Sequence, residues 1–479
     1  MKRALLAGVS VSLVFLGLSL TLSQSPSQAE AQTQTFKKIA APNVKTEPLE
    51  LTVRDQNILL AALERNFFGP GDPSEDLRQN WTKAYIPAAI EMYNYVPDRA
   101  VRETLLEQLK TSTGQDFGTN TNAWFRWLWN NPELKIKGYD NFKSEFYRQI
   151  DPRFGKYFLD RAQSAKIRLD EIRWGGVRQD GIPPLRQPKM ITASQASYLE
   201  DDNVVFGIEV NGDVRAYPKR ILAWHEMFVD TVGGVDFAGV YCTLCGTVIL
   251  YETDANGISH EMGTSGFLYR SNKLMYDKDT QSLWNTIKGE PVLGPLTGKN
   301  IALDHRSVVT TTWGKWKKLH PDTQVLSLST GHRRDYGEGV AYHQYFADDN
   351  LMFHTPFSDY RLKNKTEILA LRFKGQPHEP VAISTDFLRK NPVYSGKVGT
   401  QKYVVLTDET GANRVYDPKD VTFSKFDGNG NAKDLTGQNW KVSESKLTAP
   451  DGRELERLPY HRAFWFGWHA TYPQTELIK

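Results

Sequence analysis

The sequence predicts an α+β protein, with a helical N-terminal region followed by a larger, β-rich and mainly antiparallel domain. From Leu51 to about Ala165, apolar side chains recur at helical spacing. Beyond Trp174-Gly175-Gly176, short runs rich in β-branched and aromatic residues alternate with turn residues, which is typical of strands. We therefore expect a helical domain over residues 51–170 and a β-rich domain over residues 171–479.

The N-terminus has the pattern of a secretory signal peptide. Met1-Lys2-Arg3 is basic, Ala4 to Leu22 is apolar, and small residues follow at Ser27 and Ala29. We expect a signal peptide over residues 1–29, with Ala31 as the alternative cleavage site, and an extracytoplasmic protein that is periplasmic or secreted. An uncleaved signal anchor is the alternative, because the apolar run approaches membrane-spanning length. No later segment is apolar enough to span a bilayer.

Residues 30–50 are polar, carry Pro42 and Pro48, and are expected to form a linker. Helical spacing then predicts helices over residues 56–67, 81–95, 98–110, 122–129 and 139–148. Asp98 is placed to cap the third of these helices. The aromatic run from Trp124 to Trp129 indicates either a helix buried between neighbours or a docking surface, whether for an envelope protein or glycan partner or for the second domain.

Composition limits the possible functions. The chain has 59 basic and 56 acidic residues, a formal net charge of +3, which gives no electrostatic reason to expect a nucleic-acid partner. It has no phosphate-cradling glycine loop, so we expect no nucleotide cofactor. It also lacks the Gly-x-Ser-x-Gly and His-Glu-x-x-His motifs. Two cysteines cannot form a disulfide framework, so the hydrophobic core must stabilise the fold.

Turn residues mark two hairpins in the β-rich region. Asn211-Gly212 lies between strand-like residues 204–210 and 214–217, and Asn-Gly suits turns with positive φ. Gly233-Gly234 makes a second turn that leads into a strand ending at Cys242.

Cys242 and Cys245, the two cysteines of the chain, are expected on a tight turn between buried strands. The strand-like run from Thr247 to Tyr251 weakens a thioredoxin-type reading, in which a helix follows the pair. Gly246 stands where a c-type haem site needs His. Three interpretations stay open: a metal knuckle or functional thiol pair with glycine supplying φ > 0, a plain disulfide, and two idle buried thiols.

A metal knuckle supplies half of a four-ligand site. His225, just before the cysteine strands, is the first candidate for a further ligand. Met352 and His354 are a second candidate pair, because they share a face if residues 351–354 form a strand. Two thiolates with one His suit Cu(I), and an added hard ligand suits Zn(II), so copper and zinc are the metals to consider.

Ser265, Tyr269, Asp277, Ser282 and Trp284 form a cluster of polar and aromatic residues after the cysteine strands. They could line a pocket beside the cysteine turn. Asp277 and Ser282 equally fit the turn-forming residues of a hairpin. A Ser-His-Asp hydrolase would combine Ser265 or Ser282 with His225, but no local motif supports it.

The β-rich region resembles the bacterial family called domain of unknown function 3179. The resemblance covers roughly residues 171–479, implies a bacterial envelope protein, and implies no established activity. Thr243 stands where the family usually has Pro. The strings that carry the resemblance are Asp180-Gly181-Ile182-Pro183, Trp224-His225-Glu226, Tyr241-Cys242-Thr243-Leu244-Cys245-Gly246, Ser265-Gly266-Phe267-Leu268-Tyr269, Leu274-Met275-Tyr276-Asp277, Ser282-Leu283-Trp284, Gly294-Pro295-Leu296, Trp313-Gly314-Lys315-Trp316, His320-Pro321, Arg334-Asp335-Tyr336-Gly337 and Phe464-Trp465-Phe466-Gly467-Trp468.

Two function classes follow from these observations. In the first, Cys242, Cys245 and His225 bind copper or zinc, or the cysteines cycle between dithiol and disulfide in an envelope protein. In the second, the pair is a structural disulfide in a non-enzymatic binding module for a glycan, a cell-wall component or a protein. An enzyme that uses the pocket between Ser265 and Trp284 is a third interpretation.

Overall fold

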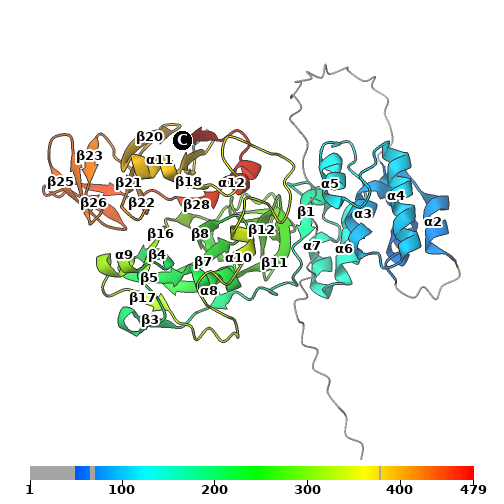
Figure 1. Cartoon of the computed structure of the whole chain (residues 1–479), viewed down its shortest axis with the longest axis horizontal. Helices are drawn as coiled ribbons and strands as arrows, with labels where there is room; N and C mark the ends of the chain where they lie inside the picture. The colour runs from blue at the N-terminus through cyan, green and yellow to red at the C-terminus, as the bar shows by residue number, and fades with distance from the viewer. Residues whose placement is uncertain (1–48, 65–70, 377–378) are drawn as a thin grey trace, which may run out of the picture. The chain divides into compact units, whose positions relative to one another are not determined.

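The structure, a computed structural model, describes residues 49–64, 71–376 and 379–479 (Figure 1). The predicted signal peptide, residues 1–29, and residues 30–48 of the predicted linker lie outside the described residues. Among the helices of the described part, none is both long enough and apolar enough to cross a membrane.

The N-terminal region is helical, as predicted. Helix α6 has the predicted bounds, and the Asp98 carboxylate accepts a hydrogen bond of 3.1 Å from the Val101 N–H at the start of α4. Helix α2 was not predicted, although Asp72 caps it and Pro73 occupies its first turn. The helices are α1 (Val53–Ala61), α2 (Pro73–Asn80), α3 (Ile86–Met92), α4 (Arg99–Thr113), α5 (Thr121–Trp129), α6 (Tyr139–Arg148) and α7 (Gly155–Phe158).

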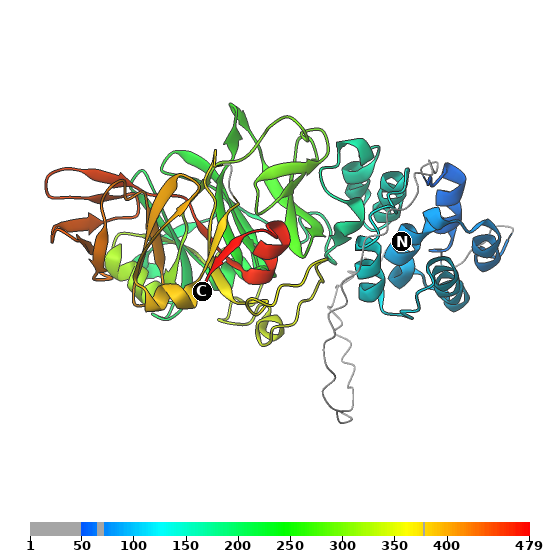
Figure 2. The same ribbon diagram turned by 90° about the horizontal axis from the view of Figure 1, so that it is seen from above.

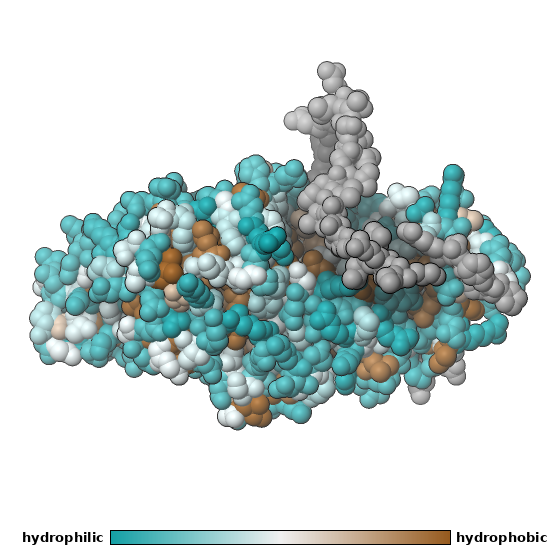
Figure 3. Space-filling model, turned by 90° about the horizontal axis from the view of Figure 1, so that it is seen from below, coloured by the Kyte–Doolittle hydropathy of each residue, from teal (hydrophilic) through white to brown (hydrophobic). Residues whose placement is uncertain are grey.

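The aromatic helix α5 is largely buried. Trp124, Phe125 and Trp129 are 2%, 3% and 7% exposed, and the Trp129 ring N–H donates to the Asp170 main-chain oxygen. The buried-helix interpretation of this run therefore holds for these three rings. The face of the molecule in Figure 3 is mostly hydrophilic, with hydrophobic side chains in small separate groups.

The β-rich region is built mainly from antiparallel pairs, as predicted. Parallel pairing joins β2 to β6, β17 to β5 and β19 to β29. The central sheet has the order β2-β6-β7-β8-β28-β18-β19-β29, with β15 paired to β8. Its strands are β2 (Leu185–Arg186), β6 (Met227–Val232), β7 (Val235–Cys242), β8 (Thr247–Glu252), β15 (His305–Arg306), β18 (Glu367–Leu371), β19 (Val381–Ser384), β28 (His461–Phe464) and β29 (Glu476–Ile478).

Further sheets surround the central one. The predicted Asn-Gly hairpin joins β4 to β5, with φ of 51° at Asn211 and 84° at Gly212. The first sheet is β1 (Ile172–Trp174), β11 (Met262–Tyr269), β12 (Asn272–Asp277), β13 (Leu283–Asn285) and β14 (Glu290–Leu293); the second is β16 (Val309–Thr312), β4 (Val204–Val210), β5 (Asp213–Pro218), β17 (Gln324–Leu326) and β3 (Met190–Thr192). The others are β9 (Asp254–Ala255) with β10 (Ile258–Ser259), then β20 (Val393–Val398), β21 (Gln401–Thr407) and β22 (Asn413–Tyr416), and then β23 (Phe423–Phe426), β24 (Asn431–Asp434), β25 (Asn439–Val442), β26 (Lys446–Thr448) and β27 (Glu454–Glu456).

One hydrophobic core runs from the helices into the sheet that contains β11. The Phe267 ring on β11 meets Tyr147 of α6 with ring centroids 4.9 Å apart and Phe158 of α7 at 5.1 Å. Buried Lys143 of α6 donates a hydrogen bond of 2.9 Å to the main-chain oxygen of Ile172 in β1. These contacts fix the sheet that carries β11 and β12 against the helices.

The C-terminal segment returns to the central sheet (Figure 2). Strand β28 pairs with β8, and helix α12 (Trp465–Thr471) follows it directly. The Phe464 N–H donates a hydrogen bond of 2.8 Å to the Cys245 main-chain oxygen. The end of β28 and the start of α12 therefore pack beside the cysteine turn.

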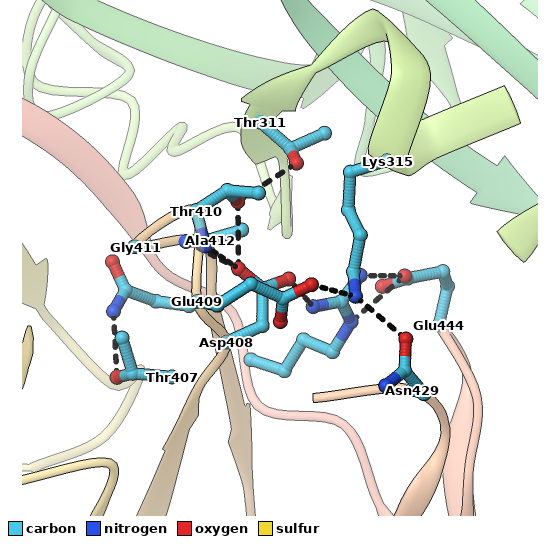
Figure 4. Close-up of polar contacts among 12 residues, drawn as sticks. Thr311, Lys315, Thr407, Asp408, Glu409, Thr410, Gly411, Ala412, Asn429 and Glu444 are labelled. Carbon is cyan, nitrogen blue, oxygen red and sulfur yellow. Dashed lines mark hydrogen bonds and ion pairs between the residues drawn. The ribbon is translucent and has the colours of Figure 1, made fainter. Parts of the chain in front are cut away.

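A buried polar cluster joins helix α9 (Trp313–Leu319) to the C-terminal hairpins (Figure 4). The Lys315 ammonium donates to Glu409 at 2.6 Å and to Asn429 at 3.0 Å. Glu444 accepts from Arg414 at 2.8 Å and from Arg457 at 3.0 Å. Burial opposes ionisation of Glu444, but the two guanidinium groups hold its pKa well below the ordinary value.

Candidate functional site

The two cysteines lie on the predicted tight turn. Strand β7 ends at Cys242, which pairs with Thr247 at the start of β8. Gly246 has a φ of 57°, and a Cβ atom there would lie 2.8 Å from the Phe464 ring. Both the backbone conformation and the close ring favour glycine at this position.

Cys242 and Cys245 form a disulfide, with Cα atoms 5.5 Å apart. The two residues are 1% and 0% exposed. The Tyr345 hydroxyl on α10 (His343–Phe346) donates a hydrogen bond of 2.7 Å to the main-chain oxygen of Leu244, inside the turn. On the other side, a Cβ atom at Gly467 of α12 would lie 2.8 Å from the Cys245 Cβ atom.

A cavity of about 60 Å³ lies beside the disulfide, and Cys242 is the cysteine that lines it. Glu226, Lys273, Tyr342 and Met352 share its wall. A volume of this size admits a few water molecules or one small side chain, whereas pockets for drug-sized ligands measure roughly 300–1,000 Å³.

Lys273 and Glu226 form a buried pair in this wall. The Lys273 ammonium donates to the main-chain oxygen of Glu226 at 2.7 Å and lies 3.5 Å from its carboxylate. The same carboxylate accepts from the hydroxyls of Thr243 at 2.7 Å and Tyr342 at 3.2 Å. Burial lowers the pKa of the Lys273 ammonium, and the Glu226 carboxylate opposes that shift. The cavity is therefore lined both by one cysteine of the disulfide and by a buried ion pair.

Glu226 reaches this cavity because it ends helix α8 (Lys219–His225) in the left-handed conformation, with a φ of 55°. Its neighbour His225 belongs to a different hydrogen-bond chain. The Pro183 carbonyl, 2.8 Å from the ring Nδ1, can only accept, so Nδ1 carries the proton and Nε2 accepts from the Tyr336 hydroxyl at 2.6 Å. Tyr336 in turn contacts the Thr330 hydroxyl at 2.6 Å.

Both ring nitrogens of His225 are thus engaged with partners other than sulfur. Burial lowers its pKa to about 4, so the ring is neutral at neutral pH. Across the part of the chain that the structure describes, no group of three or more His, Cys, Asp or Glu residues is arranged to hold a metal ion.

Residues 351–354 do not form the strand on which the pairing of Met352 with His354 depended. These residues lie in an irregular loop, so the alternation that would have placed Met352 and His354 on one face does not apply. Met352 nevertheless lines the cavity with Cys242, and its side chain is also partly in solvent, at 55% exposure.

Asp277, Ser282 and Trp284 hold a hairpin turn. The Asp277 carboxylate accepts from the Thr280 N–H at 2.8 Å and from the Trp284 ring N–H at 3.1 Å. The Ser282 hydroxyl accepts from the Leu296 N–H at 3.1 Å. These polar atoms are therefore used within the hairpin and in its contact with the turn after β14, as the turn interpretation of the sequence expects.

The other two residues of the predicted pocket are also engaged locally. The Ser265 hydroxyl donates to the Leu274 carbonyl at 2.6 Å and accepts from the Phe267 N–H at 3.0 Å, where β11 bulges. The Tyr269 ring stacks under the Arg270 guanidinium, 5.0 Å away. Of the five residues, all of them described by the structure, none lines the cavity beside the disulfide.

Sequence reasoning missed Lys273, Thr243 and Tyr342. Lys273 carries a usable signal, because it stands within the strand-like run Lys273-Leu274-Met275-Tyr276, where a charged side chain is expected to need a buried partner. Tyr342 carries no such signal, since it lies in a long irregular segment that is far from Glu226 in sequence.

The profile of a family described as "Protein of unknown function (DUF3179)" matches residues 179–475. The chain belongs to the DUF3179 family. No curated protein and no solved structure matches the chain. In this DUF3179 protein the disulfide, Glu226, Lys273 and Tyr342 all lie within the matched residues, whereas helices α1 to α7 precede them.

Proposed function

We propose that this DUF3179 protein is an extracytoplasmic thiol-disulfide exchange protein. The observation that carries the proposal is that Cys242, one half of a disulfide, lines the same small cavity as the buried Lys273–Glu226 pair. A purely structural disulfide has no need of a buried ionisable pair in the same cavity. The predicted signal peptide supports an oxidising compartment, where a disulfide can form and persist.

The reaction we propose is oxidation of a partner dithiol. A partner thiolate attacks Sγ of Cys242, the bond between the two sulfurs breaks, and Cys245 leaves with its electron pair and takes up a proton. The second partner thiol loses its proton and attacks the partner sulfur of the mixed disulfide, which releases Cys242 as a thiolate. The partner leaves as a disulfide, two electrons have moved to the cysteine pair, and the Lys273 ammonium stabilises the thiolate.

The cavity size favours a protein as the partner. A volume of about 60 Å³ accepts one cysteine side chain but not a drug-sized molecule. Met352, partly exposed and lining the same cavity, stands where an incoming chain would contact the protein.

Single-cysteine variants test this proposal. Native Cys245→Ser and Cys242→Ser proteins are mixed with glutathione disulfide, and adducts are counted by intact mass over time. We expect Cys242 in the Cys245→Ser variant to react at least about tenfold faster than Cys245 in the Cys242→Ser variant, because Cys242 lines the cavity. Circular dichroism of both variants controls for folding. If neither cysteine reacts without denaturant, or if both react equally, the proposal is refuted and a structural disulfide explains the pair.

A soft metal ion is a second candidate ligand of the reduced pair. Met352 lines the cavity with Cys242, and thiolates with a thioether are ligands that Cu(I) prefers. His225 is left out of this set because both of its ring nitrogens are engaged. About one equivalent of copper retained by the reduced protein, and lost in Met352→Leu, would support it. Equal copper in Met352→Leu would contradict it.

A further inference from the structure

The side-chain amide of Asn272 is held in one orientation. Its Nδ2 donates to the main-chain oxygens of Gly467 at 3.1 Å and Arg270 at 3.3 Å. Both neighbours can only accept, so the amide cannot be reversed without losing both bonds. This leaves Oδ1 pointing away from them, and it is a buried acceptor for which the described residues supply no donor.

The unsatisfied oxygen and Cys245 both pack closely against Gly467. A Cβ atom added to Gly467 would lie 2.9 Å from Oδ1 of Asn272 and 2.8 Å from Cβ of Cys245. The absence of a side chain at Gly467 therefore allows the amide oxygen and Cys245 to approach each other closely. Buried acceptors without a donor are rare and costly, so this one calls for an explanation.

The redox state of Cys245 supplies that explanation. A disulfide sulfur carries no hydrogen, whereas a reduced cysteine has an S–H group that can donate a weak hydrogen bond. We propose that Asn272 is a positioning residue, which accepts a hydrogen bond from the Cys245 thiol and so stabilises the dithiol form over the disulfide. This inference rests on the proposed exchange function and deepens it.

Two consequences follow for the exchange reaction. The pair becomes a stronger oxidant, because its reduced form gains a hydrogen bond that its oxidised form lacks. Cys245 is also kept protonated, since an amide oxygen favours the thiol over the thiolate. The thiolate therefore forms on Cys242, the cysteine that lines the cavity.

The test compares Asn272→Leu with wild type in glutathione redox buffers, with thiols trapped by alkylation and counted by mass. We expect the equilibrium constant for reduction to fall about fivefold, a shift of ~20 mV toward more negative potential for a two-electron couple. Asn285→Leu is the matched control, because Asn285 is also buried in this sheet and its Oδ1 accepts from Ile287 and Lys288 N–H groups. This control should lose stability without a change in potential.

Each outcome separates the two proposals. A reducible pair whose constant changes less than twofold in Asn272→Leu overturns the role of Asn272 and leaves the exchange function standing. A pair that resists reduction in the native wild-type protein overturns both. If Asn272→Leu does not fold, the infrared S–H band of the Cys245 thiol in the Cys242→Ser variant tests the hydrogen bond instead. A band shifted to lower wavenumber than that of a free thiol supports the hydrogen bond, and an unshifted band contradicts it.

Discussion

Lys273 and Glu226 are 47 residues apart in sequence, yet the Lys273 ammonium is hydrogen-bonded to the Glu226 main chain at 2.7 Å and pairs with its carboxylate at 3.5 Å. The side chains are 4% and 8% exposed. Burying two charges costs free energy, which their attraction only partly returns. A pair retained at this cost beside a disulfide is what a thiol-exchange site needs, because the ammonium can stabilise a thiolate.

Replacing Lys273 with Met should destabilise the protein by ~3 kcal/mol, since Glu226 is left buried without its cation. It should also slow glutathione adduct formation at Cys242. Urea unfolding and the adduct assay measure the two effects. Lys278→Met is the matched control, because the Lys278 ion pair with Glu261 is partly exposed to solvent and worth less than about 1 kcal/mol. Equal losses in both variants would contradict a special role for Lys273.

His225 should make stability depend on pH between 6.5 and 4. The pKa of His225 is about 4 in the folded protein and 6.5 in the unfolded chain. Between these two pH values the unfolded chain therefore binds a proton that the folded protein does not bind. The stabilisation is complete above pH 6.5 and is lost as the pH falls toward 4. Between pH 7 and pH 5, wild type should lose ~1–2 kcal/mol more than His225→Gln in urea unfolding. The exposed His343→Gln variant serves as the control, and an identical pH slope in His225→Gln would refute the assignment.

Gly246→Ala should destabilise the cysteine turn by ~2–3 kcal/mol, through positive φ and through a clash with the Phe464 ring at 2.8 Å. Gly257→Ala separates the two causes. Gly257 also has positive φ, at 74°, but nothing lies within 4 Å of an added Cβ, so it should cost only ~1 kcal/mol. Thermal unfolding of the two variants measures the difference, and equal losses would show that the ring contact is unimportant.

Glu444→Gln should cost ~3 kcal/mol, because it leaves the buried guanidinium groups of Arg414 and Arg457 without their shared carboxylate. Glu454→Gln, which removes an exposed pair with Lys446, should cost less than about 1 kcal/mol. Urea unfolding at neutral pH compares the two. A loss below about 1 kcal/mol for Glu444→Gln would show that this cluster does not hold the C-terminal hairpins in place.

The sequence predicts those features of the fold that local chemistry decides. Asn-Gly between two strands favours a turn with positive φ, and the strand-like runs on either side of the cysteines predict a tight turn between them. The disulfide was one of the alternatives that the spacing left open. Helix α2 was missed because only its Asp72 cap and Pro73 indicate it, and most of its other residues are polar.

The site itself depends on contacts that no local pattern contains. Tyr342 and Tyr336 reach Glu226 and His225 from a segment more than 100 residues away. His225 was proposed as a ligand because it comes just before the cysteine strands, and the sequence gives no sign that its ring contacts Pro183 and Tyr336. The buried Lys273 could have been suspected from its apolar neighbours, but its partner could not.

The reduction potential of the Cys242–Cys245 pair in the native protein tests the central claim most directly. The folded protein is equilibrated with glutathione buffers, and its thiols are trapped and counted by mass, with circular dichroism confirming that the fold persists. An exchange protein should show a potential less negative than about −300 mV and two thiols gained together. A potential below about −300 mV, or reduction only after unfolding, would contradict the exchange function and identify the pair as a structural disulfide.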